Sequence, residues 1–263
     1  MVSYIIICTI SLLVSALTLF SGFGLGTLLL PAFSLFFPIQ VAVGATAIVH
    51  LANNVFKAFL VGRNADPKTT IRFTIPAVLS AALGAWLLSR LGNIPPITSY
   101  TLFGHSFQIE PIKLTVGLLI GVFSLFELIP WFQKVSLHPK YIPLGGLLSG
   151  FFGGLSGLQG ALRSMFLIRV GLTKEQFVGT TVLSAIIVDV TRITVYGFVI
   201  FGQHISNLKE QGAFGLVIAG TFAALTGSIV GTQLLKKTTL GTVQKIVGVL
   251  LLVLALALVA GLI

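Results

Sequence analysis

Charged residues and cysteine are scarce in this sequence, and each scarcity excludes a class of protein. Only 8% of the 263 residues are Asp, Glu, Lys or Arg, against about 25% in soluble domains, so they cannot cover a water-exposed surface. The single cysteine, Cys8, excludes an internal disulfide and a cysteine-based metal site. The motifs GxSxG, HExxH and the P-loop are also missing. The sequence therefore predicts neither an enzyme of these types nor a bound cofactor or metal.

Long apolar stretches fill the chain instead. It is 56% hydrophobic with a mean hydropathy of +1.06, and several stretches reach the ~20 residues that cross a bilayer. A net charge of +10 suits nucleic-acid binding in a soluble protein, but the cations here lie in short segments between apolar ones, where they report membrane topology. The N-terminus lacks a basic segment and a cleavage site, so we expect a retained span. We predict an all-α polytopic membrane protein with one membrane domain.

The apolar stretches form two series, each with a long interrupted element followed by three shorter ones. The first repeat, 1–131, comprises a hairpin and three spans, at 3–37, 40–62, 72–90 and 113–131. The second repeat, 142–263, comprises the same elements at 142–170, 173–201, 213–235 and 242–263. Adding 135 to the numbers of residues 21–62 aligns the two halves, so that VGAT at 43–46 falls on VGTT at 178–181. This match predicts an internal repeat.

The cations fall mostly on one side of the predicted spans. With the loop 63–72 placed in the cytoplasm, ten cations lie in inside segments and three lie in outside segments, namely Arg90, Lys113 and Lys209. For the spans to alternate, each interrupted element begins and ends on the same side, so each is a hairpin of two short helices. The halves then have inverted topology in the cell membrane, with both termini outside.

Glycine-rich breaks divide the two hairpins, with Ser21 and Gly22 in the first and Ser156, Gly157 and Gln159 in the second. The N-terminus of a helix exposes unpaired N–H groups and a positive dipole end. Two such helix starts facing each other near the middle of the membrane would bind an anion. Close packing of spans is the alternative for any single glycine, but two breaks at matched positions favour a site.

Three cations lie within the apolar elements: Lys57, Arg163 and Arg192. Lys57 and Arg192 occupy equivalent repeat positions, and side chains lean toward the N-terminus of their own helix, so both lean toward the middle of the membrane. This favours substrate binding over snorkelling to the surface. One shared site and two stages of a path are both compatible with these positions. Arg163 either lines the path or reaches the inner surface together with Arg169.

Polar residues accompany both cations at helical spacing. The first stripe holds Thr46, His50, Asn53, Asn54 and Lys57, and the second holds Thr181, Ser184, Asp189, Arg192 and Tyr196. Their hydroxyl and amide groups suit the oxygens of an oxyanion. Hydrogen bonding between helices is the alternative for any one of them.

Three titratable residues are candidates for a coupling proton or for ion pairing. Asp189 either carries such a proton or pairs with Arg192 three residues later. His50 titrates near neutral pH, although a histidine with satisfied hydrogen bonds is the simpler interpretation. Glu127 lies in an apolar span, but its closeness to Pro130 and Lys134 favours a position near the inner interface.

Several of these features together resemble the TauE/SafE family of sulfite exporters, over nearly the whole chain. They are the glycine-rich break leading to Pro31, the VGAT step at 43–46, its repetition at 178–181, and the four-plus-four layout. Phe166 stands at the place in the second hairpin that matches Pro31, which departs from the pattern. The resemblance implies export of sulfite or related sulfur oxyanions and sulfonates. The residues alone indicate only a small anion.

Three functions are compatible with the sequence. In a secondary transporter, Lys57 and Arg192 would supply charge, and Asn53, Asn54 and Gln159 hydrogen bonds. An anion channel or an exporter of organosulfonates would share these features. A non-transporting membrane scaffold would use the polar stripes only for helix association. The expected partners are a small anion and the lipid bilayer, with no nucleic acid, and a homo-oligomer is compatible with each function.

Overall fold

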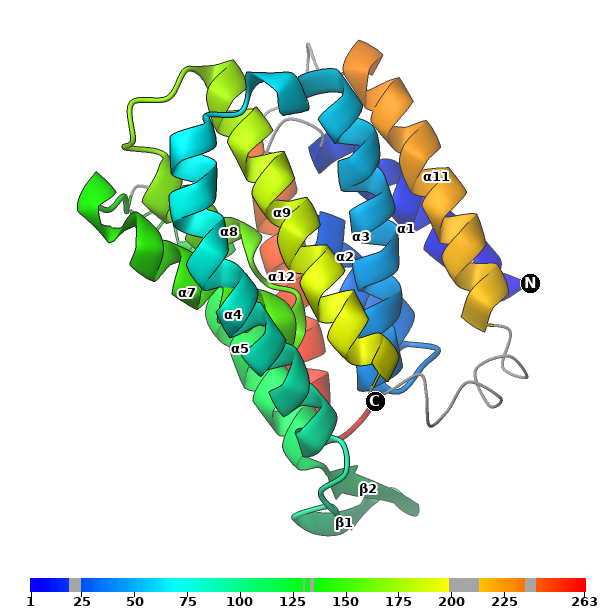
Figure 1. Ribbon diagram of the computed structural model, residues 1–263. Helices are drawn as coiled ribbons and strands as arrows, with labels where there is room; N and C mark the ends of the chain where they lie inside the picture. The colour runs from blue at the N-terminus through cyan, green and yellow to red at the C-terminus, as the bar shows by residue number, and fades with distance from the viewer. Residues whose placement is uncertain (19–24, 130, 133–134, 199–212, 235–239) are drawn as a thin grey trace.

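The computed structural model describes residues 1–18, 25–129, 131–132, 135–198, 213–234 and 240–263. It is a bundle of helices with one small β-hairpin at one end (Figure 1). The first half contains α1 (Val2–Thr18), α2 (Leu25–Ser34), α3 (Ile39–Val61), the 3-10 helix η1 (Gly62–Asn64), α4 (Pro67–Leu91), β1 (Thr98–Leu102), β2 (His105–Ile109) and α5 (Pro111–Leu128). The second half contains η2 (Pro139–Tyr141), α7 (Ile142–Ser156), α8 (Gly160–Leu167), α9 (Lys174–Tyr196), α11 (Ala213–Leu234) and α12 (Leu240–Val259).

Four helical segments in the described part are long and apolar enough to cross a membrane, namely Ile39–Asn64, Pro67–Leu91, Lys174–Tyr196 and Ala213–Gly231. Shorter apolar helical segments accompany them, at Val2–Ala16, Pro111–Phe126 and Gly248–Val259. Large apolar side chains are exposed along these helices, such as Ile75, Leu79 and Leu83 of the segment Pro67–Leu91, as expected where a surface faces lipid. The prediction of an all-α polytopic membrane protein is confirmed.

Helix α4 begins at Pro67, five residues before the span predicted at 72–90. Asp66 is its N-cap and accepts a hydrogen bond of 2.8 Å from the backbone N–H of Thr69. Hydrogen bonding to Thr69, by its side chain first and by its backbone N–H second, holds the pKa of the Asp66 carboxyl below its usual value. Proline at the first helical position supports the same start. The hydropathy pattern did not predict this first turn, because Lys68 and Arg72 interrupt the apolar run. Capping residues, which hydropathy does not detect, start the helix there.

The β-hairpin was not predicted. Phe103 and Gly104 form its two-residue turn with positive φ angles of 51° and 80°, the geometry of a type I′ turn. Tyr100 stacks on Phe107 across the strands, and its hydroxyl donates a hydrogen bond of 2.5 Å to the carbonyl of Ala260. The hairpin thereby ties the connection between α4 and α5 to the C-terminal end of α12.

The main helix–helix contacts are reciprocal between the two halves. Helix α4 packs against α7. Its counterpart α11 packs against α1, the counterpart of α7. Likewise α4 contacts α9 while α11 contacts α3, and α5 packs against its own counterpart α12. Such reciprocity is what a two-fold relation between the halves would produce. The opposite orientation of the halves in the membrane stays a prediction.

Glycines make the contact between α4 and α7 very close. Three of them, spaced four residues apart on α7, lie against the backbone of α4 so closely that a Cβ would overlap its carbonyl oxygens: Gly146 at Phe73, Gly150 at Ala77 and Gly154 at Ala81. Small residues at this spacing are the usual means of close helix packing in membranes. This contact holds the second hairpin firmly against the first half.

Candidate anion site

The first turn of α2 lies beside the second break and α3. The second break is confined to residues 157–159, because α7 continues to Ser156 and ends at Gly157 in the left-handed conformation, with φ of 81°. A Cβ built on Gly26, in the first turn of α2, would lie 3.7 Å from the Gly157 carbonyl oxygen and 3.5 Å from Cδ2 of His50. The start of α2 and the end of α7 therefore lie next to each other. Ser21 and Gly22 of the first break lie outside the described residues.

Helices α3 and α9 lie side by side and antiparallel (Figure 1). The end of α3 meets the start of α9, where the backbone N–H of Asp66 donates a hydrogen bond of 3.0 Å to Oγ1 of Thr180. Farther along, His50 of α3 contacts Asp189 of α9. These two helices carry the two polar stripes, which meet where His50 and Asn54 of α3 contact Asp189 of α9.

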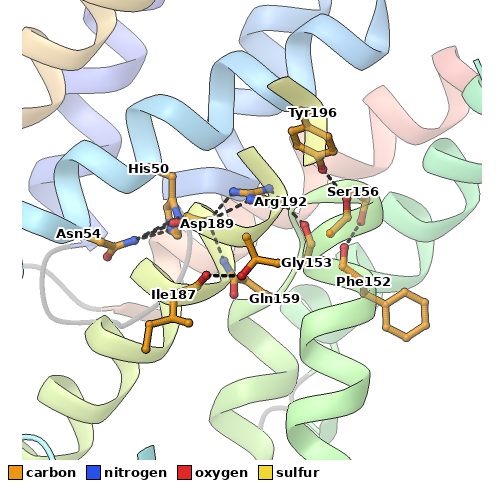
Figure 2. A network of polar contacts seen from close by, with 12 residues as sticks. His50, Asn54, Phe152, Gly153, Ser156, Gln159, Ile187, Asp189, Arg192 and Tyr196 are labelled. Atoms are coloured by element: carbon orange, nitrogen blue, oxygen red, sulfur yellow. Dashed lines mark hydrogen bonds and ion pairs between the residues drawn. The ribbon is translucent and has the colours of Figure 1, made fainter. Parts of the chain in front are cut away.

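Asp189 is the centre of the buried polar network (Figure 2). Its Oδ2 lies 2.6 Å from Nδ1 of His50, and its Oδ1 lies 2.8 Å from Nη2 of Arg192. Gln159 of the second break donates a further hydrogen bond of 3.1 Å to Oδ1. Asp189 and Arg192 are both completely buried. The positive charge of Arg192 is therefore shared with this carboxylate as well as with the carbonyl oxygen of Gly153, to which its Nη1 donates.

Arg163 belongs to the same network. Its side chain is buried, and Nη1 donates a hydrogen bond of 3.2 Å to Oε1 of Gln159, which in turn binds Asp189. Its charge also interacts with those of Lys57 and Asp189. The sequence allowed Arg163 either to line the path or to reach the inner surface. The structure places its side chain in the interior of the bundle. The described side chains of the cluster thus bring three cations together with one carboxylate.

Lys57 and Arg192 flank the His50–Asp189 contact. Lys57 lies seven residues after His50 and Arg192 three residues after Asp189, in opposite directions because the helices are antiparallel. At about 1.5 Å per residue their Cα atoms are roughly 15 Å apart along the helix axes. Both side chains lean back toward the contact, as the Arg192–Asp189 pair shows directly. Lys57 and Arg192 therefore lie on opposite sides of the His50–Asp189 contact along the helix axes.

Thr46 and Thr181 stand apart from the other helical threonines. Four of those donate to the carbonyl four residues earlier: Thr191, Thr194, Thr221 and Thr226. Thr46 and Thr181 are 2% and 1% exposed, and their hydroxyls have no hydrogen-bond partner within the described residues. The two residues are equivalent under the repeat. A buried hydroxyl without a partner is costly, which favours a ligand at both positions.

Asn53 belongs to a second polar cluster, in the first half. Its Oδ1 accepts hydrogen bonds of 3.0 Å from Ser15 and 2.6 Å from Ser228, so the cluster joins α1, α3 and α11. The Nδ2 group of Asn53 is buried and has no partner in the described part of the chain. The sequence did not indicate Ser15 or Ser228, since a single serine in an apolar span is ordinary.

Other predicted residues have structural partners. Ser156 donates to the carbonyl of Phe152, Ser184 accepts from Thr74, and the hydroxyl of Tyr196 donates to the carbonyl of Gly154. Asn54 contributes directly, with Nδ2 3.5 Å from Oδ2 of Asp189. Glu127 lies in α5, but its side chain is outside the described residues.

A cavity of about 420 Å³ opens at the end of the bundle that carries the β-hairpin. It lies between the end of α2 and the starts of α3 and α5, and is lined among others by Gln40, Glu110 and Lys113. Glu110 and Lys113 form an ion pair of 2.9 Å at its edge. Helix α3 leads from this cavity to His50.

The fold and this cluster define a membrane transport protein: apolar helices surround buried cations at the place where two broken-helix pairs meet. A family model for the sulfite exporter TauE/SafE matches residues 7–258, and the chain belongs to this family. This is a family of membrane transporters for sulfite or related anions. Comparisons with curated proteins and with solved structures gave no match.

Proposed function

We propose that the protein exports a small sulfur-containing oxyanion, sulfite first among them, through the polar cluster between its two halves. The observation that carries this proposal is the pair of threonines at equivalent positions, Thr46 and Thr181. Both are buried, and neither hydroxyl has a partner in the described residues. They lie on the two helices that bear Lys57 and Arg192.

The chemistry of the cluster suits an oxyanion. Near neutral pH sulfite is a mixture of mono- and dianion whose oxygens accept several hydrogen bonds. Lysine and arginine supply charged donors, and threonine and asparagine supply neutral ones. An anion that leaves water needs both, since an unpaired charge is expensive to bury. Organosulfonates present a similar set of oxygens and are the closest alternative substrates.

The reciprocal packing supports transport by two inverted repeats. In such transporters the substrate binds near the middle of the membrane, between the repeats, and the halves rock around it. With the loop 63–72 inside, as the distribution of cations indicates, the cavity beside Lys113 faces outward and would serve as the exit. Both termini then lie outside the cell membrane.

Binding and flux measurements test this function. Titration of the purified protein with sulfite, sulfate, thiosulfate and methanesulfonate in degassed buffer gives the ligand preference. We expect Lys57→Met to weaken sulfite binding about tenfold or more, since a hydrogen bond to a charged group contributes roughly 1.5–3 kcal/mol. Arg90→Met is the matched control, because Arg90 is exposed and lies over the Trp86 ring.

The outcomes separate the competing functions. Saturable flux of sulfite into proteoliposomes that Lys57→Met abolishes supports the exporter. Flux that rises without saturation indicates an anion channel instead. If wild-type protein neither binds nor transports any of these anions, the polar stripes serve helix association and a scaffold function takes the place of transport.

A further inference from the structure

The His50–Asp189 contact joins the two halves (Figure 2), and Gly26 at the start of α2 lies beside the His50 ring. His50 comes from α3 of the first half and Asp189 from α9 of the second. The side chain of His50 is 11% exposed, while that of Asp189 is fully buried. We propose that His50, oriented by Asp189, binds a proton that crosses the membrane together with the anion. This inference rests on the proposed function and names its coupling ion.

The hydrogen bonds of the ring indicate which atom takes the proton. Nδ1 of His50 lies 2.6 Å from Oδ2 of Asp189, so in the neutral ring Nδ1 carries the hydrogen and donates it to the carboxylate. Nδ2 of Asn54 lies 3.1 Å from Nδ1 and 3.3 Å from Nε2, and in this tautomer it donates to Nε2, which carries the lone pair. A second proton binds Nε2, and Asn54 turns its amide to present the oxygen instead. The Cδ2–Cγ edge of the ring faces Gly26, in the first turn of α2.

The charges around His50 link this proton to the anion. The charged and titratable groups near the pair are Arg163 from α8 and Arg192 and Tyr196 from α9, while Lys57 lies farther along α3 and interacts with Arg163. The buried residues of α4 and α7, which also pack against α9, include no titratable group in these two fully described helices. His50 therefore faces two cations, Arg163 and Arg192, and one carboxylate.

Cooperative binding follows from this arrangement. A proton on His50 adds positive charge beside two cations, which is unfavourable while the anion site is empty. An anion bound among these cations offsets the added charge and so favours the protonated ring. By reciprocity, a protonated ring favours the anion by the same factor. Moving the proton and the anion together also lowers the net charge that must cross the bilayer.

Proton uptake on anion binding tests the inference directly. Calorimetric titration in buffers of different ionisation enthalpy counts the protons bound with each anion. Methanesulfonate is the first probe, because its charge is constant near neutral pH, and sulfite is the second. For wild type we expect uptake of up to about one proton per anion, and an affinity that falls up to tenfold per pH unit as the pH rises above the titration of the ring.

His50→Gln is the informative variant, because glutamine still donates to Asp189 but takes no proton. It should bind methanesulfonate and sulfite without the additional proton, and the difference from wild type cancels the protonation of sulfite itself. His105→Gln, at an exposed position in the β-hairpin, is the matched control and should behave as wild type. If His50→Gln does not fold, the proton count and pH dependence of wild type decide.

Three results would overturn the inference in distinguishable ways. If wild type binds the anion without proton uptake and with a pH-independent affinity, no proton is coupled to the anion, but the proposed function stands. Proton uptake that persists in His50→Gln places the proton on another group. Absence of anion binding in wild type removes the proposed function and the coupling together.

Discussion

The contact of α1 with α11 and the contact of α7 with α4 are equivalent under the repeat, yet they are filled differently. Adding 135 to a residue of α1, or subtracting 147 from one of α11, gives its counterpart, with Gly231 falling on Gly84. Ser15 and Ser228 thus correspond to Gly150 and Ala81. At this position α1 and α11 bury hydrogen-bonded hydroxyls, whereas α7 places a glycine against the backbone of α4. Elsewhere α11 also packs closely on α1, with Gly227 and Gly231 against the carbonyls of Leu12 and Ala16.

This difference assigns the two halves different contributions to the site. The second half supplies most of the charge, through Arg163, Asp189 and Arg192. The first half supplies Lys57 and neutral polar groups, including Asn53, whose Nδ2 is without a partner in the described structure. Thr46 and Thr181 are unchanged between the halves, which is expected if both serve one ligand path.

The largest effect should distinguish the equivalent positions Asn54 and Asp189. Asp189→Ala leaves Arg192 buried without its carboxylate, so it should lower the free energy of unfolding by about 3–5 kcal/mol. Asn54→Ala removes only neutral hydrogen bonds and should cost about 1 kcal/mol. Thermal unfolding of both variants in detergent measures the difference. Equal losses would mean that the buried Asp189–Arg192 ion pair does not stabilise the fold.

Overpacking should next reveal how tightly the second half is packed. Gly154→Leu forces a side chain against the Ala81 carbonyl, so it should destabilise the protein by about 3 kcal/mol. Gly121→Ala is the control, because its Cβ would make an ordinary contact of 3.5 Å with Ala255. Size-exclusion profiles and unfolding temperatures measure both. An unchanged Gly154→Leu would contradict the close α4–α7 contact.

The matched threonines should give a smaller effect, on binding rather than on stability. Thr46→Val and Thr181→Val each remove one hydrogen bond to the anion and should weaken sulfite binding about fivefold, for roughly 1 kcal/mol. Thr221→Val, whose hydroxyl bonds the carbonyl of Val217, should leave binding unchanged. If only one of the two threonines matters, the halves do not share the ligand.

The polar cluster of the first half should show the smallest effect. Ser228→Ala removes a hydrogen bond to Asn53 while Ser15 retains its own, so the cost should be near 0.6 kcal/mol, the average for such bonds within membranes. Comparing the unfolding temperature of Ser228→Ala with that of Ala81→Ser, the reverse exchange at the equivalent position, measures this difference. A loss above 2 kcal/mol would show that the cluster is a principal support of the fold.

Apolar runs predicted the spans well, because hydrophobic length alone specifies a membrane helix. The span predicted at 40–62 is observed as Ile39–Val61. Elements controlled by capping or turn chemistry were predicted less well: α4 starts earlier than hydropathy indicates, and the β1–β2 hairpin was missed.

Part of the site was also predictable. The repeat identified Lys57, Arg192 and the polar stripes, since intramembrane charges at equivalent positions are rare. The contact between His50 and Asp189 was not predicted as such, because it depends on how α3 and α9 are aligned against each other. The interior position of Arg163 likewise required the structure, since the nearby Arg169 made a surface position equally reasonable.

The most direct test of the central claim is to locate a bound anion by anomalous scattering. Selenite has the shape and charge of sulfite and a strong anomalous signal, so crystals grown with it report the site. We expect a peak between α3 and α9, within hydrogen-bonding reach of Lys57 or Arg163 and of the hydroxyl of Thr46 or Thr181. A peak found only in the cavity beside Lys113, with none between α3 and α9, would contradict an anion path between the two halves.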